Sequence, residues 1–348
     1  MTESPRAMVG RSLEGVAILG TAAVIPETGA RLVDNDEIDH LLTGRGQRTM
    51  SAEWLAMMGV QRRLWTCVPG DPPAVDAAST DSMLAEAIEA TIADAGIDRS
   101  DVDMVVAATT TTSRLTTSMA AVATGRLGMQ CATMEVRAGC ASAAYGLATA
   151  YAHLGLGAGC VVVVAAETIT KVAPGAGPPA YLAGDGAAGV ALARTDTPGS
   201  GLVASWLSGD GSLSALAGPP GALPPNQADL DQDRYRLVMD KRFDEAAAPW
   251  WPVGPTSVLD AAGVRADAVD ALVMNQANRF RLVQTADKVG VPADALVDVV
   301  GETANAGAAS MLVALDRACR TGRAGPGSTV LVAGVGGGLC AAALVLHP

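Results

Sequence analysis

Cys140 is the residue whose type and setting most favour covalent chemistry in this chain. It lies in the segment EVRAGCASAAYG (135–146), between a strand-like stretch and a run of small residues that predicts a helix over 141–153. Free N–H groups and the dipole at a helix N-terminus stabilise a thiolate, so we expect the pKa of this thiol to be lowered. A cysteine among alanine and glycine is also an ordinary packing residue. The segment alone leaves both roles open.

Two asparagines are candidates for hydrogen-bond donors beside this cysteine. Asn275 lies in MNQANR (274–279), directly after a predicted buried strand, and Asn305 lies in ETANAGAAS (302–310), directly before a predicted helix. Their amides are suited to stabilise a thioester oxygen that develops negative charge. An asparagine in a loop more commonly forms a turn or caps a helix. Their placement opposite one cysteine favours the catalytic interpretation.

An internal repeat predicts the elements that must position these residues. DAGIDRSDVDMVV (94–106) resembles AAGVRADAVDALV (261–273), and two further pairs follow in order at nearly the same offset. Each half predicts a helix that ends at a glycine, a buried apolar strand, a small-residue helix and a second buried strand. We therefore expect an α/β fold of two duplicated halves, with helices between and outside the sheets. Residues 210–232, rich in glycine and proline, are expected to form a loop.

Composition excludes several classes of function. The formal net charge is −12 and aromatic residues make up only 3% of the chain, which argues against a nucleic-acid partner. No apolar run approaches the roughly 18 residues of a membrane span, and MTESPRAMVGRSLEG at the N-terminus lacks the apolar segment of a secretory signal. We therefore expect a cytoplasmic protein. Six cysteines and three histidines show no metal-ligand or disulfide spacing, so no metal site is predicted.

Taken together, the motifs resemble the thiolase-like condensing enzymes, and most closely their β-ketoacyl-ACP synthase III branch. The resemblance covers nearly the whole chain. It runs through the following segments: GVAILGTAAVIP (15–26), SAEWLAMMGVQRR (51–63), VVAATTTTSRLTTSMAAVATGRLG (105–128), the cysteine segment, YLAGDGAAGVAL (181–192), VMNQANRF (273–280), NAGAAS (305–310) and VAGVGGGLCAAALVL (332–346). It implies a five-layered αβαβα sandwich, usually a homodimer, and divides the chain into halves at 1–195 and 196–348.

The resemblance also implies roles for the candidate residues. Cys140 matches the cysteine that takes an acyl group from coenzyme A or acyl carrier protein, and Asn305 matches the family's active-site asparagine. Where the family has a histidine that helps stabilise the enolate of a malonyl thioester, this chain has Asn275. An asparagine amide donates a hydrogen bond but accepts no proton at neutral pH. Acylation of Cys140 is therefore expected to survive better than decarboxylation.

No other residue is an obvious replacement for that histidine. His153 lies thirteen residues along the same predicted helix, about 20 Å from Cys140, and His40 and His347 fall outside any matching motif. Glu302 precedes Asn305 and could act as a base, although a solvated loop charge is the more ordinary interpretation.

Binding of the thioester donor is expected at a second group of residues. Trp54 matches the tryptophan that stacks on the adenine of coenzyme A, but the arginine usually found between it and the glycine is absent from LAMMG. This absence favours an acyl carrier protein over coenzyme A. Carrier proteins are acidic, so docking requires a local basic patch. The candidate residues are Lys241, Arg242, Arg279 and Arg281, for which a plain solvated surface is the alternative.

The expected function is that of an acyltransferase or ketosynthase, for acyl groups other than amino-acyl, in a specialised pathway such as polyketide assembly. Acyl-CoA or acyl-ACP is a substrate, and no bound cofactor is expected; GDGAAG (184–189) lacks the features of a phosphate loop and is expected to form a turn near the site. The second hypothesis is a catalytically silent subunit that pairs with an intact homologue. Retention of Cys140 counts against it, and the absence of the histidine counts for it.

Overall fold

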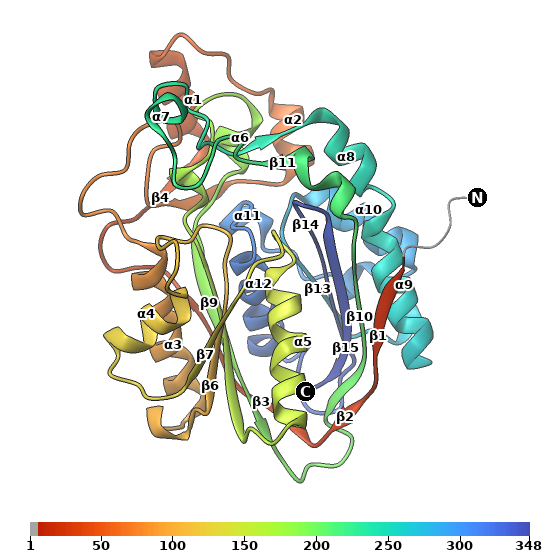
Figure 1. Ribbon diagram of the computed structural model, residues 1–348. Coiled ribbons are helices and arrows are strands. Elements are labelled where there is room, and N and C mark those ends of the chain that lie inside the picture. Colours follow the sequence, from red (N-terminus) through yellow and green to blue (C-terminus); the bar gives the residue numbers. More distant parts are fainter. Residues whose placement is uncertain (1–5) are drawn as a thin grey trace.

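The computed structural model describes residues 6–348 and shows two β-sheets separated by a layer of helices, with further helices on both outer faces (Figure 1). This is the α/β sandwich that the sequence predicts. Residues 1–5 of the stretch assessed for a secretory signal lie outside the described residues. No helix within residues 6–348 is both long and apolar enough to cross a membrane.

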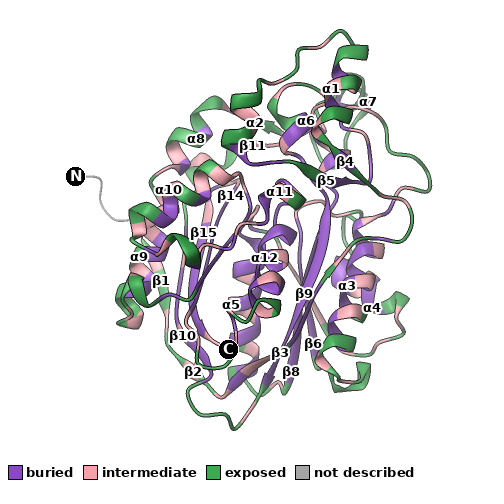
Figure 2. Cartoon of the chain, turned by 180° about the vertical axis from the view of Figure 1, so that it is seen from behind, coloured by how far each residue is buried: buried purple, intermediate pink, exposed green. Residues whose placement is uncertain are grey.

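The first sheet has parallel strands at one edge and antiparallel strands at the other. Its inner strands β8 and β9 are apolar up to their last residues, Glu167 and Arg194, because both faces are covered by helices (Figure 2). In spatial order the strands are β3 (Val16–Val24), β9 (Gly186–Arg194), β8 (Cys160–Glu167), β6 (Met104–Ala108) and β7 (Ala132–Val136).

The second sheet repeats the order of the four strands other than β7. Its strands are β1 (Ala7–Gly10), β10 (Gly201–Gly209), β15 (Cys340–His347), β14 (Val330–Gly336) and β13 (Ala271–Met274), with β2 (Leu13–Glu14) also paired to β10. Strands β6, β8 and β9 of the first sheet correspond to β13, β14 and β15 of the second, in agreement with the sequence repeat. The N-terminal strands β1 and β2 nevertheless join the second sheet. The division into halves at residue 195 stays a prediction.

Helices cover each sheet on both sides. The central layer consists of α5 (Ser142–Gly155) and α12 (Ala309–Arg320), which contact each other and strands of both sheets. The alanines and glycines of α5 allow this close packing. The outer helices are α3 (Thr80–Ala95) and α4 (Met119–Arg126) on the first sheet, and α9 (Trp250–Ala262) and α10 (Arg279–Val289) on the second.

Shorter elements gather at one end of the sandwich (Figure 1). They are α1 (Asn35–Gly44), α2 (Ala52–Met58), α6 (Pro178–Leu182), α7 (Gln227–Asp231), α8 (Lys241–Ala247), α11 (Val300–Thr303) and the strand pairs β4 (Arg31–Asp34) with β5 (Arg62–Trp65) and β11 (Ala217–Gly218) with β12 (Val238–Met239).

The segment 210–232 is more ordered than the loop expected from its glycines and prolines. Asp210 and Asn226 accept hydrogen bonds from the backbone N–H groups of Ser212 and Asp229 and begin the short helices η3 (Gly211–Leu216) and α7. Side-chain capping therefore offsets the poor helix propensity of the segment.

Candidate functional site

Cys140 lies between β7 and α5, immediately before the N-cap residue of that helix. The observed helix, Ser142–Gly155, agrees with the expected position. Two glycines define the turn around the cysteine. Gly139 adopts a φ of 57°, which favours glycine, and a Cβ on Gly336 of β14 would lie 2.7 Å from the Cys140 nitrogen. The second sheet therefore packs directly against the backbone of the cysteine.

The expected lowering of the Cys140 pKa is wrong. Burial, followed by the negative charge of Glu167, raises the pKa of this thiol to about 12. A hydrogen bond from Asn305 and the cysteine's own backbone N–H oppose the rise without cancelling it. Desolvation of the charged form thus outweighs the helix N-terminus. In this structure Cys140 is a neutral thiol at pH 7.

Asn305 is held with its amide group oriented toward the cysteine. Its backbone N–H donates to the carbonyl of Leu182 over 2.8 Å, and its Oδ1 accepts a hydrogen bond from the N–H of Gly307 over 3.0 Å. Because the oxygen is occupied, the Nδ2 group is the donor available to the thiol. The next residues begin α12, so this asparagine belongs to the second half while Cys140 belongs to the first.

Asn275 follows β13 and is 1% exposed. Its Oδ1 accepts a hydrogen bond from the N–H of Val335 over 3.2 Å, whereas its buried Nδ2 has no partner among the described residues. A Cβ on Gly334 would lie 3.2 Å from Asn275 Oδ1 and 3.3 Å from the Cα of Ala141, so Asn275 adjoins the start of α5. The structure thus brings Cys140, Asn275 and Asn305 together, as the sequence predicts.

Glu167 is a residue of this site that sequence reasoning missed. It ends β8 and is fully buried, and its carboxylate accepts hydrogen bonds from the turn 109–111 and from the start of α12. Burial raises its pKa to about 7. The signal was available in VVVVAAET (161–168), where a charged residue follows a continuous apolar strand. A second buried carboxylate, Asp185 in the GDGAAG segment, accepts hydrogen bonds from Thr66 and Thr170.

The GDGAAG segment lies beside Asn305, but the expected turn is wrong for most of it, because residues 186–189 begin the buried strand β9. The first glycine of the segment donates its N–H to the Asn305 carbonyl over 3.2 Å, and the preceding alanine pairs with Asn305 in a parallel bridge. This places the start of β9 at the edge of the site.

The histidines lie away from the cysteine. His153 is in the last turn of α5, at the end opposite Cys140, His40 is exposed on α1, and His347 ends β15. Glu302 is exposed and pairs with Arg317 over 3.0 Å and with Arg62 over 3.7 Å. The interpretation of Glu302 as a solvated loop charge fits these contacts better than a role as base.

Trp54 lies on α2 (Ala52–Met58). Its ring meets that of Tyr181 edge-on, with 6.3 Å between ring centroids. Tyr181 is fixed in turn by the fully buried Arg63, whose guanidinium donates to the Tyr181 carbonyl over 3.0 Å and to Asn35 over 2.6 Å. Burial lowers the pKa of Arg63 to about 10, which still leaves it charged at neutral pH.

The four basic candidates belong to α8 and α10, whose apolar residues share one cluster with those of α2. Arg279 pairs with Asp298 over 2.5 Å, and Arg242 pairs with Asp240 over 2.8 Å. Arg281 donates to Gln284 and lies over the ring of Trp251. Lys241 is exposed and forms no ion pair within residues 6–348. The patch is therefore partly neutralised by neighbouring carboxylates.

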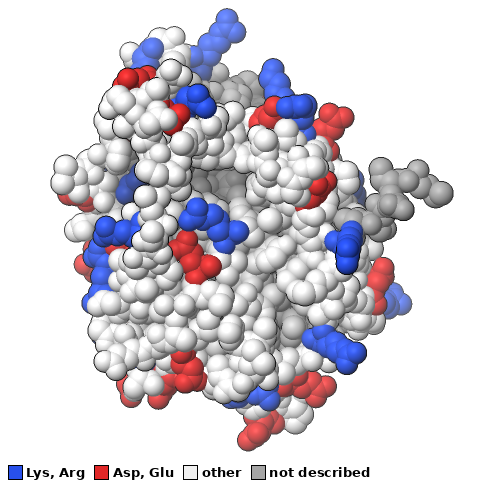
Figure 3. All heavy atoms as spheres, in the orientation of Figure 1, with Lys and Arg blue, Asp and Glu red and all other residues white. Residues whose placement is uncertain are grey.

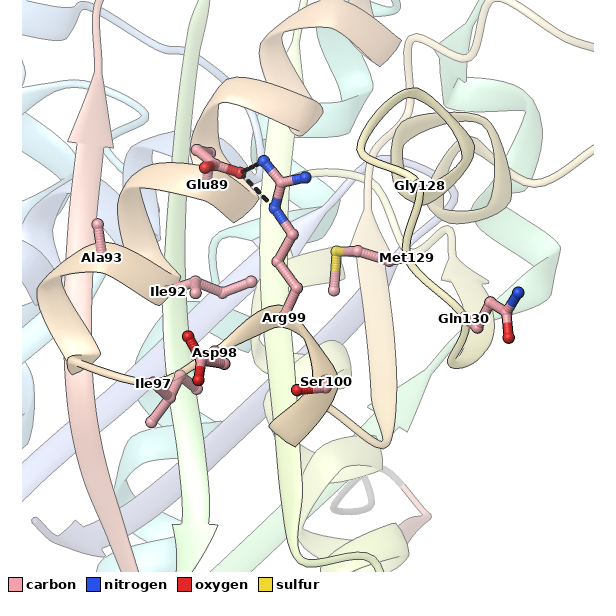
Figure 4. A pocket seen from close by; sticks show the side chains of 10 residues that line it. All are labelled: Glu89, Ile92, Ala93, Ile97, Asp98, Arg99, Ser100, Gly128, Met129 and Gln130. Atoms are coloured by element: carbon pink, nitrogen blue, oxygen red, sulfur yellow. Dashed lines mark hydrogen bonds and ion pairs between the residues drawn. The ribbon is translucent and has the colours of Figure 1, made fainter.

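The face seen in Figure 3 is hollowed above its centre, with basic and acidic side chains at the lower rim. Two further hollows lie elsewhere on the surface. The larger, about 840 Å³, is lined by the end of α3, the turn before β6 and residues 128–130, with Arg99 paired to Glu89 over 2.6 Å (Figure 4). The other surrounds the equivalent turn before β13. Both lie at the beginnings of strands, whereas Cys140, Asn275 and Glu167 follow strand ends, so neither is the reaction site. Within residues 6–348, no group of three histidine, cysteine or acidic side chains is placed to bind a metal ion.

Known proteins with the same organisation identify the family. Models described as 3-oxoacyl-[acyl-carrier-protein] synthase III, and its C-terminal part, match residues 134–211 and 259–347. The β-ketoacyl-[acyl-carrier-protein] synthase III of Bordetella petrii is 32% identical over 334 residues, covering 95% of this chain and 97% of the relative. The chain belongs to the β-ketoacyl-[acyl-carrier-protein] synthase III family. It is accordingly an acyltransferase of the synthase III type.

Solved structures support this assignment. FabH of Pseudomonas aeruginosa PAO1, a synthase III, superposes with a TM-score of 0.81 at 26% identity, covering 96% of this chain and 98% of that one. The priming β-ketosynthase of the R1128 polyketide pathway gives a TM-score of 0.81 at 26% identity and covers 97% of both chains. The thiolase-like fold of the synthase III family therefore extends over nearly the whole molecule.

Proposed function

We propose that this synthase III-like enzyme takes an acyl group from a coenzyme A or carrier-protein thioester onto Cys140 and passes it to a second substrate. The second step forms a carbon–carbon bond, an ester or an amide. We place the enzyme in a specialised, polyketide-type pathway, and the likeness to a priming ketosynthase supports that assignment. A homodimer is part of the proposal. In the described residues β7 is an edge strand, paired only with β6, which leaves it available to a second copy.

The first half-reaction releases no proton overall. The Cys140 sulfur bonds to the acyl carbon, the carbon–sulfur bond of the donor breaks, and the thiol proton passes to the departing sulfur. One thiol and one thioester are present before and after the exchange. A neutral Cys140 thiol, as found in this structure, therefore carries the proton that the leaving group requires.

The observation that carries the proposal is the free Nδ2 of Asn275. A buried amide donor without a partner costs free energy in the resting protein, and this one lies at the start of the cysteine helix. We infer that Asn275 stands where the family has its histidine and that its N–H, with that of Asn305, donates to the acyl oxygen as negative charge develops. One such donor typically contributes about 10²–10³-fold in rate.

Intact-protein mass spectrometry after incubation with a panel of acyl-CoA and acyl-carrier thioesters tests this function. We expect one acyl mass on the wild-type protein, none on Cys140→Ala, and an unchanged adduct on Cys131→Ala, which removes another partly exposed cysteine. The acyl masses that appear identify the substrate class and the preferred donor.

An adduct that persists in Cys140→Ala, or no adduct from any donor, would contradict the proposed acyl transfer. The second result would favour the silent-subunit hypothesis, which co-purification with an intact synthase from the native cell would then examine.

A further inference from the structure

Glu167 is surrounded by hydrogen-bond donors that carry no charge. Its carboxylate accepts from the N–H groups of Thr110 and Thr111 over 3.0 and 3.1 Å and from their hydroxyl groups over 3.0 and 2.7 Å. The N–H of Ala308 donates from the start of α12 over 3.4 Å. No ion pair within residues 6–348 includes Glu167. This buried acid is therefore held by neutral groups from both halves of the molecule.

The position of Glu167 is related by the internal duplication to that of Gly336. Glu167 ends β8 beside Gly307 at the start of α12, where a Cβ on that glycine would lie 3.0 Å from the carboxyl group. Gly336 ends β14 beside Gly139 and Cys140 at the start of α5. One central helix thus begins at a carboxylate, which suits its positive end, and the other begins at the cysteine. Helix α12 has no side-chain cap of its own, and Glu167 accepts the N–H of its N-cap residue Ala308 from the opposite half.

Glu167 and the amide of Asn305, which faces the cysteine, meet at Gly307. A Cβ on Gly307 would lie 3.0 Å from Glu167 Oε1, and the N–H of the same glycine donates to Asn305 Oδ1 over 3.0 Å. Glu167 is the charged side chain that raises the pKa of the Cys140 thiol, second only to burial. From the second half the cysteine is faced by Asn305 and Asn275, which are both neutral. A like charge close to an acid disfavours its ionised form.

We propose that Glu167 is a positioning residue of the acyl site, which joins the turn 109–111 to the start of α12 and, through its charge, adds to the effect of burial that keeps Cys140 a neutral thiol. This proposal rests on Cys140 as the nucleophile. It explains how the thiol keeps the proton that the leaving sulfur needs, although the nearby helix N-terminus favours loss of that proton.

The pH profile of Cys140 alkylation by iodoacetamide, followed by peptide mass spectrometry, tests the proposal without an acyl donor. In the wild type, Glu167 ionises near pH 7, well before the cysteine. Between the two ionisations the pair has lost one proton, either from Glu167 or from Cys140. These two forms interconvert without gain or loss of a proton, so the ratio of the Cys140 thiolate form to the Glu167 carboxylate form is independent of pH. We expect the rate to rise with pH, level off above about pH 7, and rise again.

Glu167→Gln removes the charge while keeping the shape. We expect a single rise in its profile and alkylation about tenfold faster than wild type on the alkaline side. Glu167→Asp keeps a charge and should retain two steps. Asp185→Asn is the matched control, since it neutralises another fully buried carboxylate held by threonines but absent from the groups that shift the Cys140 pKa. Its profile should be that of the wild type.

A single-step wild-type profile would overturn the proposal. The same conclusion would follow from a folded Glu167→Gln variant, shown by its circular dichroism, with an unshifted profile. If that variant does not fold, the wild-type and Glu167→Asp profiles decide. Failure of the acyl-loading experiment with a two-step alkylation profile would contradict the proposed function and leave the electrostatic role standing.

Discussion

The side-chain oxygen of Asn275 accepts a hydrogen bond, whereas its Nδ2 group has no partner in the described residues. The engaged oxygen, which accepts from Val335, fixes the side chain, and the free Nδ2 is buried beside the start of α5. An asparagine in this state offers a donor of fixed orientation but no group that accepts a proton at neutral pH. At the scale of single residues, the site is therefore suited to oxygen stabilisation and poorly suited to proton removal.

Asn275→His should restore decarboxylation of a malonyl thioester. We expect a gain of at least about 10²-fold over wild type, the lower end of the usual contribution of an acid–base group. The flexible Met311 side chain, which reaches the Gly334 position next to Asn275, can move to admit the ring. Release of labelled CO₂ measures the effect. Asn275→Ala is the control, for which we expect no gain in decarboxylation and slower acylation of Cys140. Equal decarboxylation by the wild type and both variants would contradict the role given to this position.

The residue types of the site were largely predictable, but their acidities were not. Cys140, Asn275 and Asn305 were identified because the repeat and the motifs place them on facing edges. The thiol pKa was expected to move in the opposite direction, because a helix start can be recognised in sequence whereas the depth of burial cannot. Glu167 was missed for the same reason. A charged residue at the end of an apolar strand marks Glu167 as unusual, but the sequence gives no indication of which groups surround it.

At the scale of elements, Gly139 and Gly336 have no side chains, which allows β14 to contact the turn before α5. Gly336→Ala would place a methyl group 2.7 Å from the Cys140 nitrogen and in conflict with the Ala138 carbonyl. Because backbone atoms on both sides resist displacement, we expect about 1–3 kcal/mol of lost stability and at least tenfold slower acylation, since misplacement of a reacting group is costly. Thermal unfolding and acyl-loading rates measure the two effects.

Gly44→Ala is the matched control for this substitution. Gly44 is in the last turn of α1, and a Cβ there meets nothing within 4 Å. Alanine is the better helix former, so stability should be unchanged or raised by up to about 1 kcal/mol. If Gly336→Ala behaved like this control, close packing of β14 would not determine the position of the cysteine.

At the scale of the whole molecule, a net charge of −12 must be reconciled with the docking of an acidic carrier protein. Lys241 is the basic candidate without an ion pair in the described residues. Lys241→Glu should raise KM for an acyl-carrier donor several-fold at low salt and leave KM for an acyl-CoA donor unchanged, because surface charges mainly steer the encounter. The difference should shrink as salt is added.

Lys288→Glu is the comparison that separates docking from net charge. Lys288 is exposed in the last turn of α10, at the end opposite Arg279. An equal effect of both substitutions on KM would assign the change to the overall charge and would contradict a docking role for Lys241.

Most of the molecular architecture was predictable because the repeated segments of the two halves can be recognised in the sequence. The repeat indicated the order of strands and central helices in both halves. It gave no indication that β1 and β2 cross to the second sheet, because strand pairing between distant segments depends on tertiary contacts. The ordered parts of 210–232 depend on individual caps at Asp210 and Asn226, which a composition rich in glycine and proline conceals.

The difference between the two central helix starts has a consequence for stoichiometry. The two related halves each contribute a central helix whose N-terminus can hold an anion. In the described residues, the N-terminus of α5 has a nucleophilic thiol beside it, that of Cys140. At α12 the corresponding place is taken by the Glu167 side chain, which accepts a hydrogen bond from the N–H of Ala308. We therefore expect the duplicated chain to carry one acyl equivalent, because one of its two symmetric positions has become part of the environment of the other.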